Sequence, residues 1–281
     1  MRERRRMVLP TTLLHYLVMI GLALLWVLPL VSALAMSVLP LSDIRRGWWN
    51  LEFGKLTVEN YAKAWDAGIS QYVVNSFIIT ILSISLMLVV GSLAAYAFAR
   101  MRFHFQKTCF VLAIFTLVLP VQVVLIPLST LFREFGLSSG SSQFIGIALV
   151  HAGFGAGWVL LMLVPSFRAV PLEIEEAATI DGAGRMRLFL NIALPLAGPG
   201  LVSFAIVQVV FVWNDLLLGL TLLDRQHQPL TVGLANLQSP VLAQTDLVAA
   251  GSIMAILPPL LLFTLLNRHY VRGMFAGTGK G

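Results

Sequence analysis

The sequence has little charge and almost no cysteine. Of its 281 residues, 11% are charged and 58% are hydrophobic, with a mean hydropathy of +0.87. Soluble domains average about 25% charged residues, and disordered chains combine low hydrophobicity with high charge, so both classes are excluded. The single cysteine, Cys109, excludes a disulfide scaffold. A polytopic helical membrane protein is the class that remains.

Catalytic and metal-binding motifs are missing as well. The sequence contains no HExxH, no GxSxG and no paired cysteines or histidines. Residues 277–281 superficially resemble a phosphate loop, but they lack the Ser or Thr after the lysine and the upstream glycine spacing. We therefore expect a non-catalytic chain with no metal and no cofactor of its own.

Six long apolar segments lie along the chain, and none contains Lys or Arg. A bilayer core about 30 Å thick needs roughly 20 apolar residues of helix, and these segments are too long for barrel strands. We predict an all-α polytopic membrane protein with one lipid-embedded domain over residues 13–266 and short ends at 1–12 and 267–281. The predicted spans are Leu13–Val38, Tyr72–Ala99, Cys109–Leu131, Gln143–Val164, Gly200–Leu223 and Leu247–Leu266.

The Lys and Arg residues are distributed unevenly over the ends and connectors. Thirteen of the 19 lie in the N-terminal end, the second and fourth connectors and the C-terminal end. Cytoplasmic segments carry such an excess, so both termini are predicted to be cytoplasmic, as an even number of spans requires. Topology then accounts for the net charge of +6, and no nucleic-acid partner is expected.

The first span has a second interpretation. A basic start, an apolar stretch and Ala33-Leu34-Ala35 follow the order of a cleaved signal peptide. The apolar stretch before Ala33 runs for about 19 residues, whereas a cleaved one typically has about 7–15. We therefore favour a retained first span.

The fourth connector, residues 165–199, has the pattern of a structured element. Pro171 suits the first turn of a helix, and three glutamates follow where the helix dipole favours negative charge. Gly182 is placed to end that helix, and a second helix is expected over Arg185 to Ala193, before Pro195. We predict a projecting element that docks on another protein. The alternative is an amphipathic connector that lies on the lipid headgroups. Such a connector is usually rich in Lys and Arg on its polar face, whereas this helix begins with three glutamates.

Residues 176–195 resemble the cytoplasmic EAA loop of ATP-binding-cassette (ABC) importer permeases. Glu176-Ala177-Ala178 is followed after three residues by Gly182, and after nine more by Ile192, one residue and Leu194-Pro195. In that family the loop forms a coupling helix that fits a cleft on the cytoplasmic ATPase subunit. The resemblance implies that the ATPase-coupling residues are Glu175, Glu176, Ala177, Ala178, Asp181, Gly182, Ile192, Leu194 and Pro195.

Other segments resemble carbohydrate permeases related to the smaller membrane subunit of maltose importers. These segments are Leu56–Tyr61, Asn75–Phe77, Trp213–Asp215 and Tyr270–Gly273. The resemblance implies a type I ABC importer transmembrane domain in a prokaryotic inner membrane, importing a sugar or related polar solute. It also implies three partners: a second permease subunit, a cytoplasmic ATPase dimer that uses ATP and Mg²⁺, and an extracytoplasmic solute-binding protein.

Asp215 is the only acidic residue inside a predicted span. Placing such a group at the centre of a membrane-spanning helix costs about 2.5–3.5 kcal/mol on insertion scales, so its side chain should face protein or water and not lipid. Together with Trp213, Asn214 and Gln208 it is predicted to line a substrate pathway, with a ring to stack on a sugar and polar groups for its hydroxyls. That Asp215 instead caps or kinks its helix, or bonds a neighbouring span, stays open. His151 is interpreted as a packed, neutral hydrogen-bonding residue.

Small residues and prolines should shape the spans. Gly153, Gly155 and Gly157 favour close helix packing, and Pro120 and Pro127 favour kinks.

A self-sufficient secondary transporter is the alternative function. It requires coupling carboxylates near the midplane and paired broken helices. One intramembrane aspartate and no sign of an inverted repeat disfavour it, and the lack of a catalytic cluster disfavours an intramembrane enzyme. Robust solute uptake by this chain alone under an ion gradient would contradict the ABC interpretation.

Overall fold

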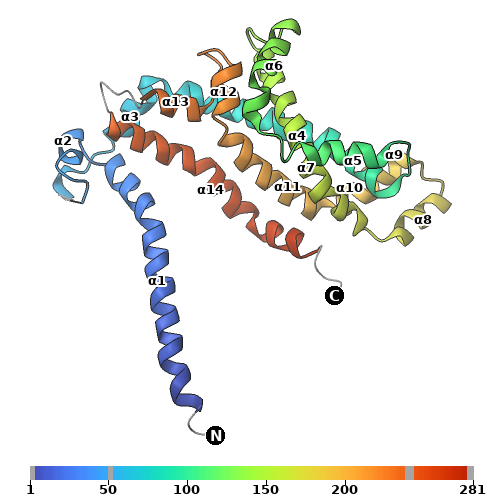
Figure 1. Ribbon diagram of the computed structural model, residues 1–281, viewed down its shortest axis with the longest axis horizontal. Helices are drawn as coiled ribbons and strands as arrows, with labels where there is room; N and C mark the ends of the chain where they lie inside the picture. Colours follow the sequence, from blue (N-terminus) through green and yellow to red (C-terminus); the bar gives the residue numbers. More distant parts are fainter. Residues whose placement is uncertain (1–3, 50–52, 238–243, 277–281) are drawn as a thin grey trace. The chain divides into compact units, whose positions relative to one another are not determined.

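The structure is a computed structural model that describes residues 4–49, 53–237 and 244–276 (Figure 1). These residues form helices and turns, without a strand among them. The chain divides into a smaller unit, Met1–Ile69 with Asn236–Met254, and a larger unit, Ser70–Ala235 with Ala255–Gly281. The all-α fold predicted from hydropathy is confirmed for this part of the chain.

The smaller unit contains a long apolar helix followed by short helical turns. Buried Asn60 donates hydrogen bonds to the carbonyls of Ser37 at 3.1 Å and Leu39 at 2.9 Å. The Tyr61 hydroxyl shares a 2.8 Å hydrogen bond with the Ser37 hydroxyl. These contacts tie the turns to the end of the long helix. The elements are α1 (Arg4–Ser37), α2 (Leu41–Ile44), η1 (Phe53–Lys55), α3 (Glu59–Ala64) and the π turn η2 (Trp65–Ile69).

The larger unit is built on three long helices that pack against one another: α4 (Ser70–Arg100), α7 (Ser142–Arg168) and α11 (Gly198–Trp213). Shorter helices connect them, and two helices run from one unit to the other. The shorter ones are α5 (Gln106–Phe115), α6 (Val121–Glu134), α8 (Leu172–Ile180), α9 (Arg185–Leu188), η3 (Phe189–Ala193), α10 (Leu194–Leu196) and α12 (Leu217–Leu222). Those shared between units are α13 (Leu230–Leu237) and α14 (Thr245–Ala276).

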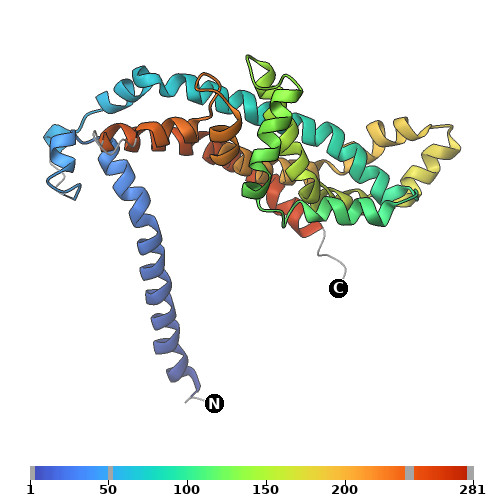
Figure 2. The same cartoon turned by 45° about the horizontal axis from the view of Figure 1, so that its top comes forward.

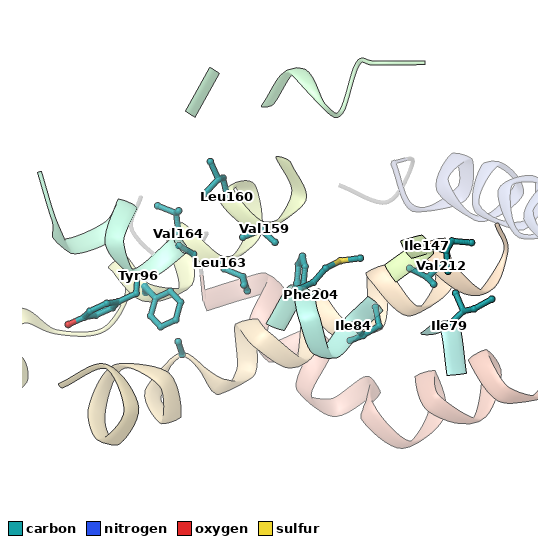
Figure 3. Close-up of a cluster of buried hydrophobic side chains, with 14 of the residues drawn as sticks. Ile79, Ile84, Tyr96, Ile147, Val159, Leu160, Leu163, Val164, Phe204 and Val212 are labelled. Atoms are coloured by element: carbon teal, nitrogen blue, oxygen red, sulfur yellow. The ribbon is translucent and has the colours of Figure 1, made fainter. Parts of the chain in front are cut away.

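The core of the larger unit lies where α4, α7 and α11 meet (Figure 3). Leu163 and Phe204 are fully buried there. A Cβ atom on Gly91 would lie 2.8 Å from a Val159 methyl carbon, and one on Gly155 would lie 2.7 Å from the sulfur of Met87. Small residues at these two positions therefore allow the close approach of α4 and α7. Of the predicted stretch, Gly155 takes part in this contact, Gly157 packs against the α5 segment near the Ala113 carbonyl, and Gly153 has no atom within 4 Å of its Cβ position.

Four described helices are long and apolar enough to span a bilayer. The pair Arg185–Leu196 and Gly198–Trp213, bent by 72°, makes a fifth if it counts as one span. The predicted third span is two helices: α5 ends at Phe115, and extended Pro120 precedes α6, since proline cannot continue the hydrogen-bonded ladder. The predicted fifth span is likewise two helices, α11 and α12, with a break over residues 214–216. The six-span count and the cytoplasmic termini stay predictions. The four helices are Thr12–Ser37, Glu59–Arg100, Ser142–Arg168 and Thr245–Leu266.

Candidate functional site

Helix α8 lies at one end of the larger unit, away from α12 (Figures 1 and 2). The Gly182 N–H donates to the Thr179 carbonyl at 3.0 Å, and the Ala183 N–H donates to the Ala178 carbonyl at 2.9 Å. This pair of bonds is a Schellman motif, which ends a helix with a left-handed residue. Gly182 has a φ of +85°, where a side chain costs about 1–2 kcal/mol. The glycine therefore gives α8 a sharp end.

Helix α8 has an exposed face and a buried side chain opposite to it. Glu173, Glu176, Ala177 and Ile180 recur at three- and four-residue spacing and are exposed. Ile180, at the end of this face, is 87% exposed. Glu175 is buried instead, so the structure places it apart from the other glutamates with which the sequence grouped it.

Glu175 ties α8 to the end of α4. Arg100 Nε donates to Glu175 Oε1 at 2.8 Å, and the Tyr96 hydroxyl donates to Glu175 Oε2 at 3.1 Å. Arg100 Nη2 also donates to the Val170 carbonyl at 2.6 Å. The side chains of Arg100 and Glu175 are only 11% and 9% exposed. A desolvated pair with additional hydrogen bonds is a firm connection, because breaking it would leave a buried charge uncompensated.

After α9 the chain continues as one helix into the bundle. The π turn η3 leads directly into α10, whose second residue is Pro195. The expected helix end before Pro195 is therefore corrected. The Phe189 ring in η3 packs 5.2 Å from the Tyr96 ring, and the chain then bends by 72° into α11. Of the predicted coupling residues, Asp181 and Pro195 are exposed, whereas Ile192 and Leu194 are half-buried.

A cavity of about 240 Å³ lies between α7 and α11. Its polar lining consists of His151 from α7, Gln208 from α11 and Asp215 from the break before α12. His151 Nε2 lies 4.0 Å from Asp215 Oδ2. Within the described residues, neither buried His151 Nε2 nor buried Gln208 Nε2 has a hydrogen-bond partner. Two of the four predicted pathway residues, Gln208 and Asp215, are thus brought together, and His151 joins them.

Asp215 also caps the next helix. Its carboxylate accepts hydrogen bonds from the N–H groups of Leu218 at 3.3 Å and Gly219 at 3.0 Å. The Thr231 hydroxyl donates to its backbone carbonyl. The helix-capping interpretation is therefore confirmed, and Asp215 also lines the cavity, whereas its place in a substrate pathway stays a prediction.

Trp213 and Asn214 lie outside this cavity. The Trp213 indole donates to the Ala255 carbonyl at 3.0 Å, and its ring meets the edge of Phe77 at 5.0 Å. Trp213 is 4% exposed, so it joins α11 to α4 and α14 by packing. Exposed Asn214 donates back to the Val210 carbonyl at 2.8 Å. The aromatic surface predicted beside Asp215 is therefore not formed by Trp213.

The chain after α12 is held by polar side chains of α4. Asn75 donates to the carbonyls of Gln226 at 2.8 Å and Gln228 at 2.9 Å. The Ser76 hydroxyl accepts a 2.8 Å hydrogen bond from the Leu230 N–H. These contacts give Asn75 and Ser76 the role of fixing the loop before α13.

The start of α7 holds the same loop. Gln143 is fully buried, donates to the Asp224 carboxylate at 2.7 Å and accepts from the Asp224 N–H at 2.8 Å. Burial raises the pKa of Asp224, but hydrogen bonds from His227 and Gln143 outweigh this and hold the pKa below its usual value. The carboxylate therefore stays charged in its contacts at neutral pH.

A family model described as the binding-protein-dependent transport system inner membrane component matches residues 87–276. The chain belongs to this family. A probable ABC transporter permease of Pyrococcus horikoshii is 36% identical to this permease over 259 residues, which cover 91% of this chain and 92% of that protein. The melibiose/raffinose/stachyose import permease of Bacillus subtilis is 32% identical over 228 residues, covering 80% and 82%.

The permease also shares its fold with a solved structure. One chain of the crystal structure of a bacterial ABC transporter involved in alginate import superposes with a TM-score of 0.74. The match covers 96% of this chain and 98% of that chain at 19% identity. The helical arrangement described above is therefore that of an ABC importer transmembrane domain.

Three residues of the permease that bear on its site were missed by sequence reasoning, and a fourth, His151, was given a different role. Tyr96 and Arg100 are four residues apart on one helix face, which is a local signal, but their partner Glu175 is 75 or more residues away. Ile180 continues the spacing of the exposed face of α8, and this pattern could have been found. His151 is packed as expected, but its Nε2 has no hydrogen-bond partner among the described residues, and only the packing of α7 on α11 places it beside Asp215.

Proposed function

We propose that the chain is the translocation-pathway subunit of an ATP-driven importer for a sugar or related polar solute. It resides in a prokaryotic inner membrane with six transmembrane segments and cytoplasmic termini. It is not itself catalytic: ATP and Mg²⁺ are used by a cytoplasmic ATPase dimer that binds α8. A second permease subunit completes the pathway, and an extracytoplasmic binding protein delivers the solute. The family supports this assembly, and the names of its sugar-importing relatives support the solute class.

The observation that carries the proposal is the presentation of α8. An exposed stripe of Glu176, Ala177 and Ile180 projects from a helix that is fixed on its other side by the Arg100–Glu175 pair. Small side chains allow a close approach by a partner, and Ile180 offers an apolar group to bury. The three features together fit a helix that is gripped and moved by another protein.

The contacts around α8 supply two routes into the bundle. The first runs through Glu175 and Arg100 to the end of α4. The second runs through η3 and α10 to α11, which carries Gln208 into the cavity. Displacement of α8 by the ATPase would therefore move α4 and α11. Both of these helices pack on α7. We propose this as the means by which nucleotide-driven motion opens and closes the pathway.

The test is capture of the ATPase by the membrane complex. Glu176→Lys reverses a charge on the exposed face of α8 and is expected to abolish copurification of the ATPase. Membrane insertion and assembly with the second permease subunit should be unchanged, because the Glu176 side chain is exposed.

The matched control is Glu134→Lys, which makes the same charge reversal at another exposed position, the end of α6. This variant should copurify with the ATPase as the wild type does. Normal capture and transport by Glu176→Lys would refute the docking role of α8.

A further inference from the structure

The cavity between α7 and α11 contains polar atoms that lack partners. His151 is 8% exposed and Gln208 is 3% exposed, and both line the cavity. Among the described residues, no atom accepts or donates a hydrogen bond at His151 Nε2 or Gln208 Nε2. Buried polar groups in proteins are normally hydrogen-bonded, so unpartnered polar atoms on two residues of one cavity wall point to a polar occupant.

The geometry of the polar atoms fits a hydroxyl group. His151 Nε2 and Asp215 Oδ2 are 4.0 Å apart, too far for a direct hydrogen bond. A single oxygen between them can lie about 2.8 Å from both atoms. A hydroxyl can donate its one hydrogen to the carboxylate and accept a hydrogen bond from the imidazole in the tautomer that carries the proton on Nε2. The Gln208 amide adds a donor for a second hydroxyl oxygen.

The rest of the lining suits the apolar face of a ring. Trp158 and Phe211 lie in the wall, with their ring centroids 5.6 Å apart. A mostly apolar pocket with a few convergent polar groups is the usual form of a small-molecule site. The volume of about 240 Å³ is slightly below the roughly 300–1,000 Å³ of pockets for drug-sized ligands, which favours one sugar ring or a polyol.

Larger hollows elsewhere in the same unit differ in chemistry. A hollow of about 420 Å³ is bordered by the turn after α5, by α6 and by α7, and its lining is almost entirely apolar. No buried unpaired nitrogen lines it among the described residues. Buried polar atoms without a partner therefore distinguish the cavity with His151 and Gln208 from this larger hollow.

We propose that this permease contacts the transported solute directly, binding one hydroxyl-bearing ring in the cavity through His151, Gln208 and Asp215. The inference rests on the proposed import function and adds to it a defined site in this chain. Trp158 and Phe211 pack against the ring, and the polar groups replace the water that its hydroxyls lose.

The test uses the complete importer in proteoliposomes, with both permease subunits, the ATPase and the binding protein. The probes are glucose, melibiose, raffinose and diacetylchitobiose. His151→Leu and Gln208→Leu are expected to lower the amount of sugar moved per ATP hydrolysed by about two- to tenfold, as the loss of one hydrogen bond implies. ATP hydrolysis stimulated by the loaded binding protein should persist, because the coupling contacts at α8 are untouched.

Two controls make the result specific. Gln122→Leu makes the same chemical change at an exposed position of α6 outside the cavity and should transport as the wild type does. In a Cys109→Ser background, a thiol reagent should label Gln208→Cys more slowly when the transported sugar is present. This second measurement decides the matter if a leucine variant fails to assemble.

The outcomes separate the two proposals. Unchanged sugar-to-ATP ratios in both variants, or labelling of Gln208→Cys that no transported sugar slows, would overturn the solute site and leave the import function standing. A wild-type importer that moves none of the four sugars would overturn the sugar-import proposal, and the site would fall with it.

Discussion

Replacement of Arg100 by methionine should release α8 from the bundle without touching its exposed face. The change removes the 2.8 Å ion pair with Glu175 and the 2.6 Å hydrogen bond to the Val170 carbonyl. Both charged side chains are about nine-tenths buried, so the remaining carboxylate keeps only the Tyr96 hydroxyl as a partner. Breaking one partner of a buried pair costs about 3–5 kcal/mol.

This loss of stabilising free energy is larger than the stability that α8 has as an isolated helix. The helix has nine residues, and an isolated helix shorter than about 12–15 residues is marginal in water. We therefore expect the amides of Ala177, Ala178 and Thr179 to lose their protection in Arg100→Met. Hydrogen exchange of the complex in nanodiscs measures this directly, and ATPase copurification should fall in parallel.

A double variant separates charge from packing. Replacing both Arg100 and Glu175 with methionine removes the uncompensated charge, and such replacements of a buried pair are often neutral or stabilising. Protection of α8 should therefore return in the double variant. Arg102→Met is the matched control, because Arg102 is exposed two residues farther along. Full α8 protection and full ATPase capture in Arg100→Met would refute the anchoring role of the pair.

Two further predictions concern backbone geometry. Gly182→Ala should destabilise the end of α8 by about 1–2 kcal/mol, because its φ of +85° disfavours a Cβ atom. Gly182→Asn should cost less, since asparagine tolerates this region, and ATPase affinity measures both. Asn75→Ala should release the loop before α13 by removing two hydrogen bonds worth about 0.5–1.5 kcal/mol each, seen as faster hydrogen exchange at residues 226–230. Gln71→Ala, which removes one exposed bond to the Gln226 carbonyl, should have the smaller effect.

Each of these two predictions can be contradicted by one result. Equal ATPase affinities for the alanine and asparagine variants of Gly182 would show that the left-handed conformation is not what the motif requires. Unchanged exchange at residues 226–230 in Asn75→Ala would show that the loop is held by other contacts, such as those of Gln143 with Asp224.

The EAA loop shows which parts of the site were predictable from local pattern. The break at Gly182 followed from the chemistry of helix ends, and the Schellman bonds confirm it. The helix end expected before Pro195 was wrong, because the π turn η3 places the proline in the first turn of α10. A change of hydrogen-bond register of this kind leaves no mark in hydropathy or spacing.

The predicted pathway shows the opposite case. Trp213, Asn214 and Asp215 are consecutive, so the sequence suggested one surface, yet successive residues of a helix point in different directions. The indole of Trp213 packs on Phe77 and α14, whereas Asp215 lies after the end of α11 and faces the cavity. His151 could not be joined to them without knowing how α7 packs on α11.

The sequence by itself determined the class of fold and the identity of the projecting loop. Apolar length and charge placement are local quantities, and the EAA spacing is a pattern along a single chain. Only the tertiary structure decided that Glu175 pairs with Arg100 and that His151, Gln208 and Asp215 share one cavity. These contacts join residues that lie 57 or more positions apart or on different helix faces, and the free energy of burying them depends on three-dimensional packing that no local pattern encodes.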